Sequence, residues 1–80
     1  MNSTNTIYIV ESGWIFVGRY LNSDAEAVSL ENASVVRSWS NGRGIGGLAL
    51  RAHKDEYTLD AVGRIQLMKG KILAEIPCEW

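Results

Sequence analysis

Arginine and glycine gather in the middle of this 80-residue sequence, in a pattern that could bind an anion. Residues 32–54 contain no acidic side chain, although the whole chain carries a net charge of −1. Their positive side chains are Arg37, Arg43, Arg51 and Lys54. Because arginine can donate two parallel hydrogen bonds to one phosphate group, the segment suits a phosphorylated partner. This charge asymmetry therefore predicts a negatively charged ligand.

Residues 42–47, which we call the glycine segment, contain four glycines. Glycine lets backbone N–H groups approach a ligand closely, and successive N–H groups can form an anion-binding concavity. The segment is not a P-loop, because it lacks the Gly-Lys-Ser/Thr ending. It also lacks the alternating strands and long helices of a dinucleotide-binding unit. The alternative interpretation is a flexible turn without a ligand.

Aromatic residues flank the glycine segment and could hold a nucleotide base. Trp39 precedes it and Tyr57 follows it, and stacking on such rings stabilises a base by about 1–3 kcal/mol. The predicted ligand-binding residues are Arg37, Trp39, Asn41, Gly42, Arg43, Gly44, Arg51 and Tyr57. For each arginine the alternative is solvated surface or a salt bridge. For Trp39 the alternative is a place in the core or an interface, and we expect Trp14 in the core.

No set of residues predicts catalysis. His53 has no recognisable triad partner, and Cys78 beside Pro77 is expected to be a small buried hydrophobe. With one cysteine and one histidine, the sequence predicts neither a metal site nor a disulfide within the chain. We therefore expect a binding protein, not an enzyme, with no catalytic residues, metal or cofactor.

Length and composition predict one small domain over residues 7–80, preceded by a disordered N-terminus at residues 1–6. A chain this short buries only about 60% of its unfolded surface, and oligomerisation is a usual remedy. An apolar content of 46% with three tryptophans favours a homo-oligomer. No apolar run of membrane-spanning length or signal peptide occurs, so a cytosolic setting is expected. The absence of an overall Lys/Arg excess argues against a DNA or RNA polymer as partner.

Short β-rich runs dominate the sequence. Expected strands lie at residues 7–10, 14–21, 27–30, 35–39, 57–59, 64–68 and 72–76, with an interruption at Asn32-Ala33 and a short helix at 45–52. The second strand is apolar on nearly both sides, so we expect the core to cover one face and a neighbouring subunit the other. The predicted fold class is mostly β: a small antiparallel sheet or barrel of five to seven short strands, with at most one or two short helical turns.

The order of several short motifs is similar to that of a family of small bacteriophage β-proteins. These motifs are an apolar strand bounded by glycines at residues 13–18, then Asn32-Ala33, Trp39-Ser40, Leu48-Ala49 and finally Ile76-Pro77-Cys78. The family includes the Thoeris anti-defence sponge, and the resemblance covers residues 7–78. Two features differ: Arg37 stands where the family has a second aromatic residue, and the characterised sponge continues well beyond the Pro-Cys motif.

The resemblance implies a phage protein in the host bacterial cytoplasm that sequesters an immune signal without degrading it. The signal would be a cyclic ADP-ribose isomer made by TIR enzymes, a cyclic oligonucleotide of a second immune system such as CBASS, or both. It also implies a homo-oligomer built from dimers, a hexamer as a trimer of dimers, with ligand bound between subunits. The rival hypothesis is a small structural or protein–protein interaction module of a phage, using Trp14 and Trp80 as contacts. Enzymatic cleavage of the signal is a third option.

Overall fold

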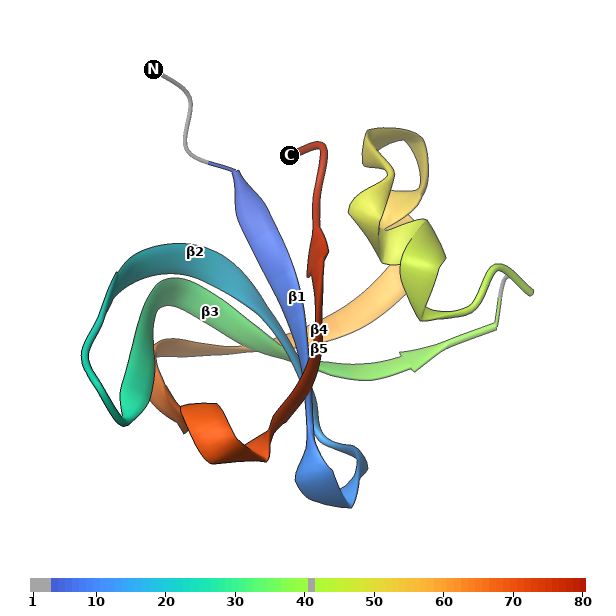
Figure 1. The fold of residues 1–80 in the computed structure, drawn as a ribbon. Helices are drawn as coiled ribbons and strands as arrows, with labels where there is room; N and C mark the ends of the chain where they lie inside the picture. Colours follow the sequence, from blue (N-terminus) through green and yellow to red (C-terminus); the bar gives the residue numbers. More distant parts are fainter. Residues whose placement is uncertain (1–3, 41) are drawn as a thin grey trace.

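The computed structural model of the protein describes residues 4–40 and 42–80. They form one antiparallel sheet of five strands in the order β4-β3-β2-β1-β5 (Figure 1). The strands are β1 (Asn5–Val10), β2 (Ile15–Ser23), β3 (Ala27–Trp39), β4 (Tyr57–Met68) and β5 (Ile72–Pro77). Short 3-10 helices accompany them: η1 (Glu11–Gly13), η2 (Ile45–Ala49), η3 (Arg51–Glu56) and η4 (Lys69–Lys71). The predicted mostly-β class is confirmed.

The elements differ from the prediction mainly in three places. β1 begins at Asn5, because its N–H donates to the Trp80 carbonyl at 2.6 Å and its carbonyl accepts from the Cys78 N–H at 2.9 Å. Residues 5 and 6 are therefore strand, not disordered N-terminus. The strands expected at 57–59 and 64–68 are one strand, β4. The helix expected at 45–52 is replaced by η2 and η3, since the glycines at 46 and 47 disfavour a regular α-helix.

A bulge in β3 confirms the predicted interruption near Asn32. The register with β4 shifts between Leu30 and Ala33, and Asn32 takes a positive φ of 50°. On the neighbouring strand β2, Gly18 lies against this bulge. A Cβ on Gly18 would lie 2.9 Å from the Cβ of Ala33, so only glycine fits there without movement.

A second bulge lies in β4. Ala61 and Gly63 pair with the adjacent residues Ser34 and Ala33, so Val62 is an extra residue without a partner on β3. Gly63 has a φ of 79°, a conformation that glycine adopts readily.

The β4 bulge changes which face of the sheet the odd-numbered residues of the strand occupy. Before it, Tyr57 and Leu59 pack into one hydrophobic cluster; after it, Leu67 and Ile65 pack into the other. Successive side chains alternate between faces in a regular strand, so one extra residue exchanges the two faces. β4 thereby serves both clusters.

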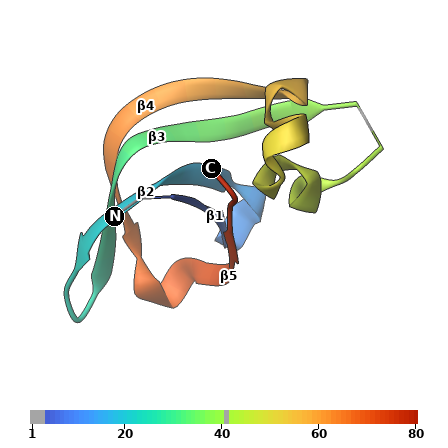
Figure 2. The same ribbon diagram turned by 90° about the horizontal axis from the view of Figure 1, so that it is seen from above.

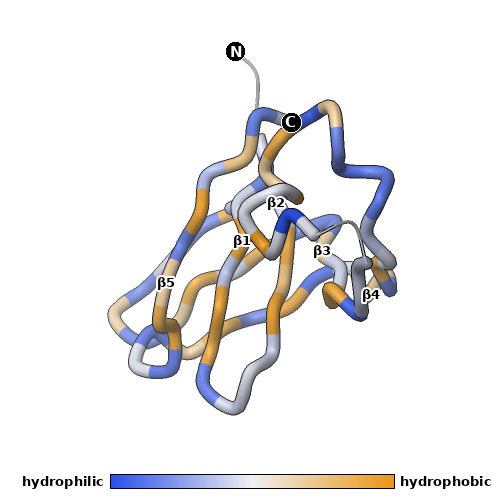
Figure 3. Tube along the Cα trace, turned by 90° about the vertical axis from the view of Figure 1, so that its right-hand side faces the viewer, coloured by the Kyte–Doolittle hydropathy of each residue, from blue (hydrophilic) through white to orange (hydrophobic). Residues whose placement is uncertain are grey.

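Both faces of the sheet carry a core. We call the first the capped core; its buried members are Ile7, Val17, Val36, Leu48, Ala49, Tyr57 and Cys78. The second core contains Tyr8, Val10, Val28, Leu30, Ala33 and Leu67. Hydrophobic residues accordingly recur along the strands, interspersed with hydrophilic ones (Figure 3).

The central strand β2 is apolar on both sides because it contributes to both cores. Val17 is buried in the capped core, with Ile15 packed against it, and Phe16 packs against the second core. The second face of β2 is thus covered by the same chain, not by the neighbouring subunit expected. Trp14 is not in the core: its side chain is 55% exposed and stacks on Phe16, with ring centroids 6.1 Å apart.

The helices η2 and η3 lie at one end of the sheet, next to the ends of β3 and β4 (Figure 2). The C-terminal segment ties them down. Trp80 Nε1 donates to the Leu48 carbonyl at 2.7 Å, and the Glu79 N–H donates to the Ala49 carbonyl at 2.8 Å. Lys54 Nζ lies 5.2 Å from the centroid of the Trp80 ring.

None of the helices in the described residues has the length and apolar character needed to cross a membrane.

Candidate functional site

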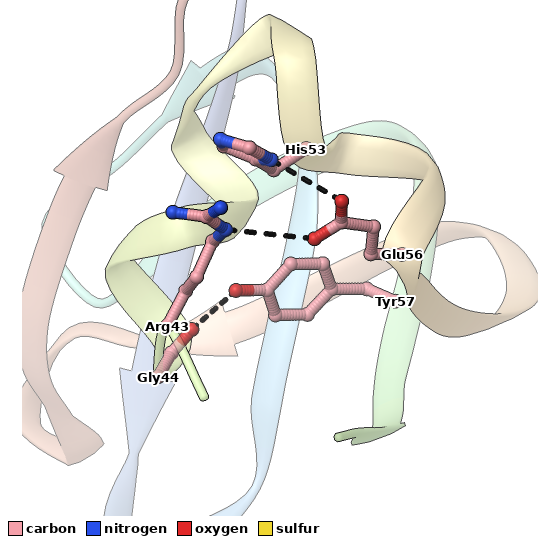
Figure 4. A network of polar contacts seen from close by, with 5 residues as sticks. All are labelled: Arg43, Gly44, His53, Glu56 and Tyr57. Carbon is pink, nitrogen blue, oxygen red and sulfur yellow. Dashed lines mark hydrogen bonds and ion pairs between the residues drawn. The ribbon is translucent and has the colours of Figure 1, made fainter. Parts of the chain in front are cut away.

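A network of polar contacts joins the glycine segment to η3 and β4 (Figure 4). Arg43 Nε lies 3.7 Å from one oxygen of Glu56, and His53 Nδ1 lies 3.2 Å from the other. The Tyr57 hydroxyl donates to the carbonyl of Gly44. The Arg43 and Glu56 side chains are about half exposed, so solvent and solutes reach this network.

Two glycines are explained by this arrangement. Gly44 has a φ of 67° as it precedes η2, and its carbonyl faces the tyrosine hydroxyl. At Gly47, an added Cβ would collide with the Tyr57 hydroxyl and lie 2.7 Å from the Cβ of Arg43. Gly42 also has a positive φ, of 76°, and an added Cβ there would meet nothing within 4 Å. The glycine segment is therefore folded around the end of Tyr57.

Trp39 and Tyr57 form an aromatic pair at the end of the β3–β4 ladder. Their ring centroids are 5.6 Å apart, with planes inclined by 37°. Tyr57 is only 6% exposed, whereas Trp39 is half-buried against the capped core. Of the two predicted stacking residues, Trp39 is therefore the one whose ring reaches solvent.

Arg37 lies on the opposite face of the sheet from this pair. Its Nη1 contacts Asp60 Oδ2 at 2.5 Å, and Asp60 follows Leu59, which packs against the capped core. Because neighbouring strand residues point to opposite faces, Asp60 and its partner Arg37 point away from that core. Arg37 and Trp14 both line a hollow of about 270 Å³ there. Arg37 and Trp39 thus do not share one site within a subunit.

Arg51 contacts the C-terminal segment. Its backbone N–H donates to Glu79 Oε1 at 2.9 Å, and its Nη2 donates to the Glu79 carbonyl at 2.8 Å. Carboxylates from outside residues 32–54 therefore contact this acid-free segment. Asp60 contacts Arg37, Glu56 contacts Arg43 and Glu79 contacts Arg51. The remaining predicted residue, Asn41, lies outside the described residues.

The structure brings together Trp39, Gly42, Arg43, Gly44 and Tyr57 and adds two residues that the prediction left out. His53 and Glu56 are three residues apart within η3, a spacing that places side chains on one face of a helical turn. The helix expected from the sequence ended at residue 52, so this spacing did not indicate a pair. A second hollow, of about 440 Å³, is lined by Arg64 together with Leu21, Asn22, Ser29, Leu30, Ile65 and Gln66. No sequence signal singled out Arg64.

The titratable groups of the capped core offer little reactivity. Cys78 is 7% exposed, as expected for a small buried hydrophobe, and its burial raises the pKa of the thiol to about 11. A neutral thiol is a poor nucleophile. Among the described residues, no three histidine, cysteine or acidic side chains are grouped so that they could hold a metal ion.

Comparison of the chain with protein-family models, curated proteins and solved structures found no match.

Proposed function

We propose that this protein binds a small cyclic nucleotide at the site formed by Trp39, Arg43, the glycine segment and Tyr57. The observation that supports the proposal is the half-buried Trp39 ring. It packs against Tyr57, and the Tyr57 hydroxyl and the Arg43 side chain both lie next to Gly47. A base can stack on the exposed part of Trp39, and a phosphate can accept hydrogen bonds from Arg43. Tyr57, being buried and bonded to Gly44, acts as a support for both.

The proposed activity is capture of the ligand unchanged, not catalysis. A phage protein in the cytoplasm of an infected bacterium would in this way lower the free concentration of a cyclic ADP-ribose isomer or a cyclic oligonucleotide. Effective capture requires a Kd near the nanomolar range, which corresponds to about 12 kcal/mol. A site on one subunit that is open to solvent is poorly suited to this affinity, because tight-binding sites bury most of their ligand.

Association of subunits would enclose the ligand more fully. Large apolar side chains remain exposed on the subunit: Trp14, Tyr20, Leu21, Leu50, Val62, Met68 and Leu73. Leu50, 42% exposed, joins η2 to η3 beside the candidate site. We therefore propose a homo-oligomer, a dimer or a hexamer built from dimers, in which a second subunit closes the site. In such an assembly Arg37 and Arg51 can contact the ligand from a neighbouring subunit.

Calorimetry with cyclic ADP-ribose isomers and cyclic di- and trinucleotides tests the proposal. We expect at least one ligand with a Kd well below about 10 µM, a value worth about 7 kcal/mol. Mass spectrometry of the ligand released by heating should then recover it unmodified. Absence of binding by all of them at that level would refute the function, and recovery of a cleaved product would indicate an enzyme.

An interaction module is the second candidate, and the exposure of Trp14 favours it. This ring is 55% exposed beside the hollow that Arg37 lines, on the face opposite the candidate site. Tryptophan and arginine are enriched among the residues that dominate protein–protein binding. Stoichiometric co-purification of a host protein, lost in a Trp14→Ala variant and without bound nucleotide, would support this candidate over ligand capture.

A further inference from the structure

Two nitrogen atoms converge on one carboxylate at the candidate site. Arg43 approaches one oxygen of Glu56 with Nε, and His53 approaches the other with Nδ1, at 3.7 and 3.2 Å. The two donors come from different segments, the glycine segment and η3, so their convergence is a property of the fold (Figure 4). A carboxylate that contacts two such donors occupies the place that a bound anion's oxygens would take.

The neighbouring charged groups have other partners. Lys54 Nζ contacts Asp55 at 3.3 Å and lies over Trp80, while Arg51 contacts Glu79. The buried Tyr57 presents its hydroxyl to the Gly44 carbonyl. Arg43 and His53 are therefore the side chains whose nitrogens face Glu56 among the contacts described above.

We propose that Arg43 and His53 form a phosphate subsite, and that Glu56 fills this subsite until a ligand phosphate displaces it. Glu56 has 42% of its side chain exposed, so it can swing into solvent without opening the core. Its contacts with Arg43 and His53 are those of a surface ion pair, which is a weak interaction that a dianionic phosphate can outcompete. The proposal rests on the proposed function for the identity of the natural ligand, but the subsite itself accepts any small phosphate.

Glu56 then acts as a competitor for the ligand. Replacing it with glutamine removes the negative charge while keeping the shape of the side chain. The Glu56→Gln variant should bind a phosphate ligand about twofold to fivefold more tightly, equivalent to up to about 1 kcal/mol. Arg43→Lys should weaken binding by a similar or larger factor, because lysine cannot reproduce the planar donor geometry of arginine.

The single histidine of the chain provides a direct reporter, because its ring protons give one set of NMR signals. The probe is inorganic pyrophosphate, titrated at constant pH and ionic strength into the full chain. We expect the His53 signals to shift and saturate in the unaltered protein, to saturate at lower pyrophosphate concentration in Glu56→Gln, and at higher concentration in Arg43→Lys. Unmoved His53 signals, or equal or weaker binding by Glu56→Gln, would overturn the proposal.

Asp60→Asn is the matched control, since it also removes an acidic partner from an arginine, but on the opposite face of the sheet. It should leave the His53 titration unchanged; the same gain as in Glu56→Gln would overturn the proposal in favour of a general charge effect. Glu56→Ala replaces Glu56→Gln if the latter does not fold. Pyrophosphate binding at His53 without any cyclic-nucleotide binding would refute the proposed function and leave this subsite standing. Nucleotide binding that does not change in the Glu56 and Arg43 variants would refute this subsite and leave the proposed function standing.

Discussion

Gly47 shows how tightly a single residue of the glycine segment is constrained. The Tyr57 hydroxyl and the Arg43 side chain occupy the space that a β-carbon would need. Gly46, next to it, has no neighbouring heavy atom within 4 Å of the same position and no positive φ. Two adjacent glycines therefore differ in kind, one required by packing and the other open to substitution.

Gly47→Ala should destabilise the protein by about 1–3 kcal/mol, the usual cost of forcing extra atoms into a packed site. Gly46→Ala is the matched control and should change the free energy of unfolding by less than about 0.5 kcal/mol. Urea denaturation of both variants measures the difference. Equal effects at the two positions would contradict the packing of Tyr57 against the glycine segment.

Cys78 predicts a stability change at alkaline pH. Burial raises the pKa of its thiol from 9.0 to about 11, so the unfolded chain loses this proton at lower pH than the folded chain does. The thiol's contribution to stability is therefore fully present below pH 9.0 and is lost as the pH rises to about 11. Urea unfolding across this pH range should show the decline, and Cys78→Ala should flatten it. A decline of the same size in Cys78→Ala would assign it to other groups.

Individual residues were predicted unevenly from the sequence. Burial of Cys78 was correctly predicted because its type and neighbours settle it. Trp14 was expected in the core, whereas the structure exposes it just before β2. Regular alternation along a strand would place Arg37 and Trp39 on the same face, but the register shift between Val36 and Ser38 separates them. Such shifts decide which face a side chain occupies and leave no clear mark in the sequence.

At the scale of elements, the β2–β3 turn depends on Asp24. Its Oδ1 accepts hydrogen bonds from the backbone N–H groups of Glu26 at 2.7 Å and Ala27 at 2.8 Å. These two bonds lower the pKa of the Asp24 carboxyl below 3.8. The charged form is thus favoured in the folded state.

The contribution of Asp24 should therefore be present above pH 3.8 and should disappear as the pH falls through the lowered folded-state pKa. Asp24→Asn keeps an oxygen acceptor and should remove this acid dependence with a small loss of stability near neutral pH. Asp24→Ala removes the acceptor and should lower the melting temperature further. Thermal melts between acid and neutral pH compare the three proteins; an unchanged acid dependence in Asp24→Asn would contradict this role.

The strands were largely predictable because their β-branched and aromatic runs are interrupted by clear turns. The continuity of β4 was not predictable, since Asp60 and Gly63 are residue types that are common in turns. Pairing with the long strand β3 overrides that local preference. A short helix at 45–52 was predicted, but its division into η2 and η3 and the extension of η3 to Glu56 were not, because contacts with Tyr57 and the C-terminal segment shape this region.

The whole molecule has two small cores and a surface with exposed apolar side chains. Trp14→Ser should change the free energy of unfolding of the isolated subunit by less than about 1 kcal/mol, because this ring is mostly exposed. If Trp14 lies in a subunit interface, sedimentation should show smaller species for the variant than for the unaltered protein. Val17→Ala, at a position only 3% exposed, is the contrasting control and should cost clearly more. Destabilisation of the two variants to the same degree would contradict the exposed position of Trp14.

The unpaired Val62 makes β4 one residue longer than its ladder with β3 needs. If Val62 is deleted, Ala61 and Gly63 become neighbours that alternate as their partners Ser34 and Ala33 do, and Ile65 and Leu67 keep their places in the second core. Deleting Gln66, which is paired with Ser29, would instead turn Leu67 to the other face. Removal of Val62 should therefore leave the protein folded, whereas removal of Gln66 should lower the free energy of unfolding strongly in urea denaturation.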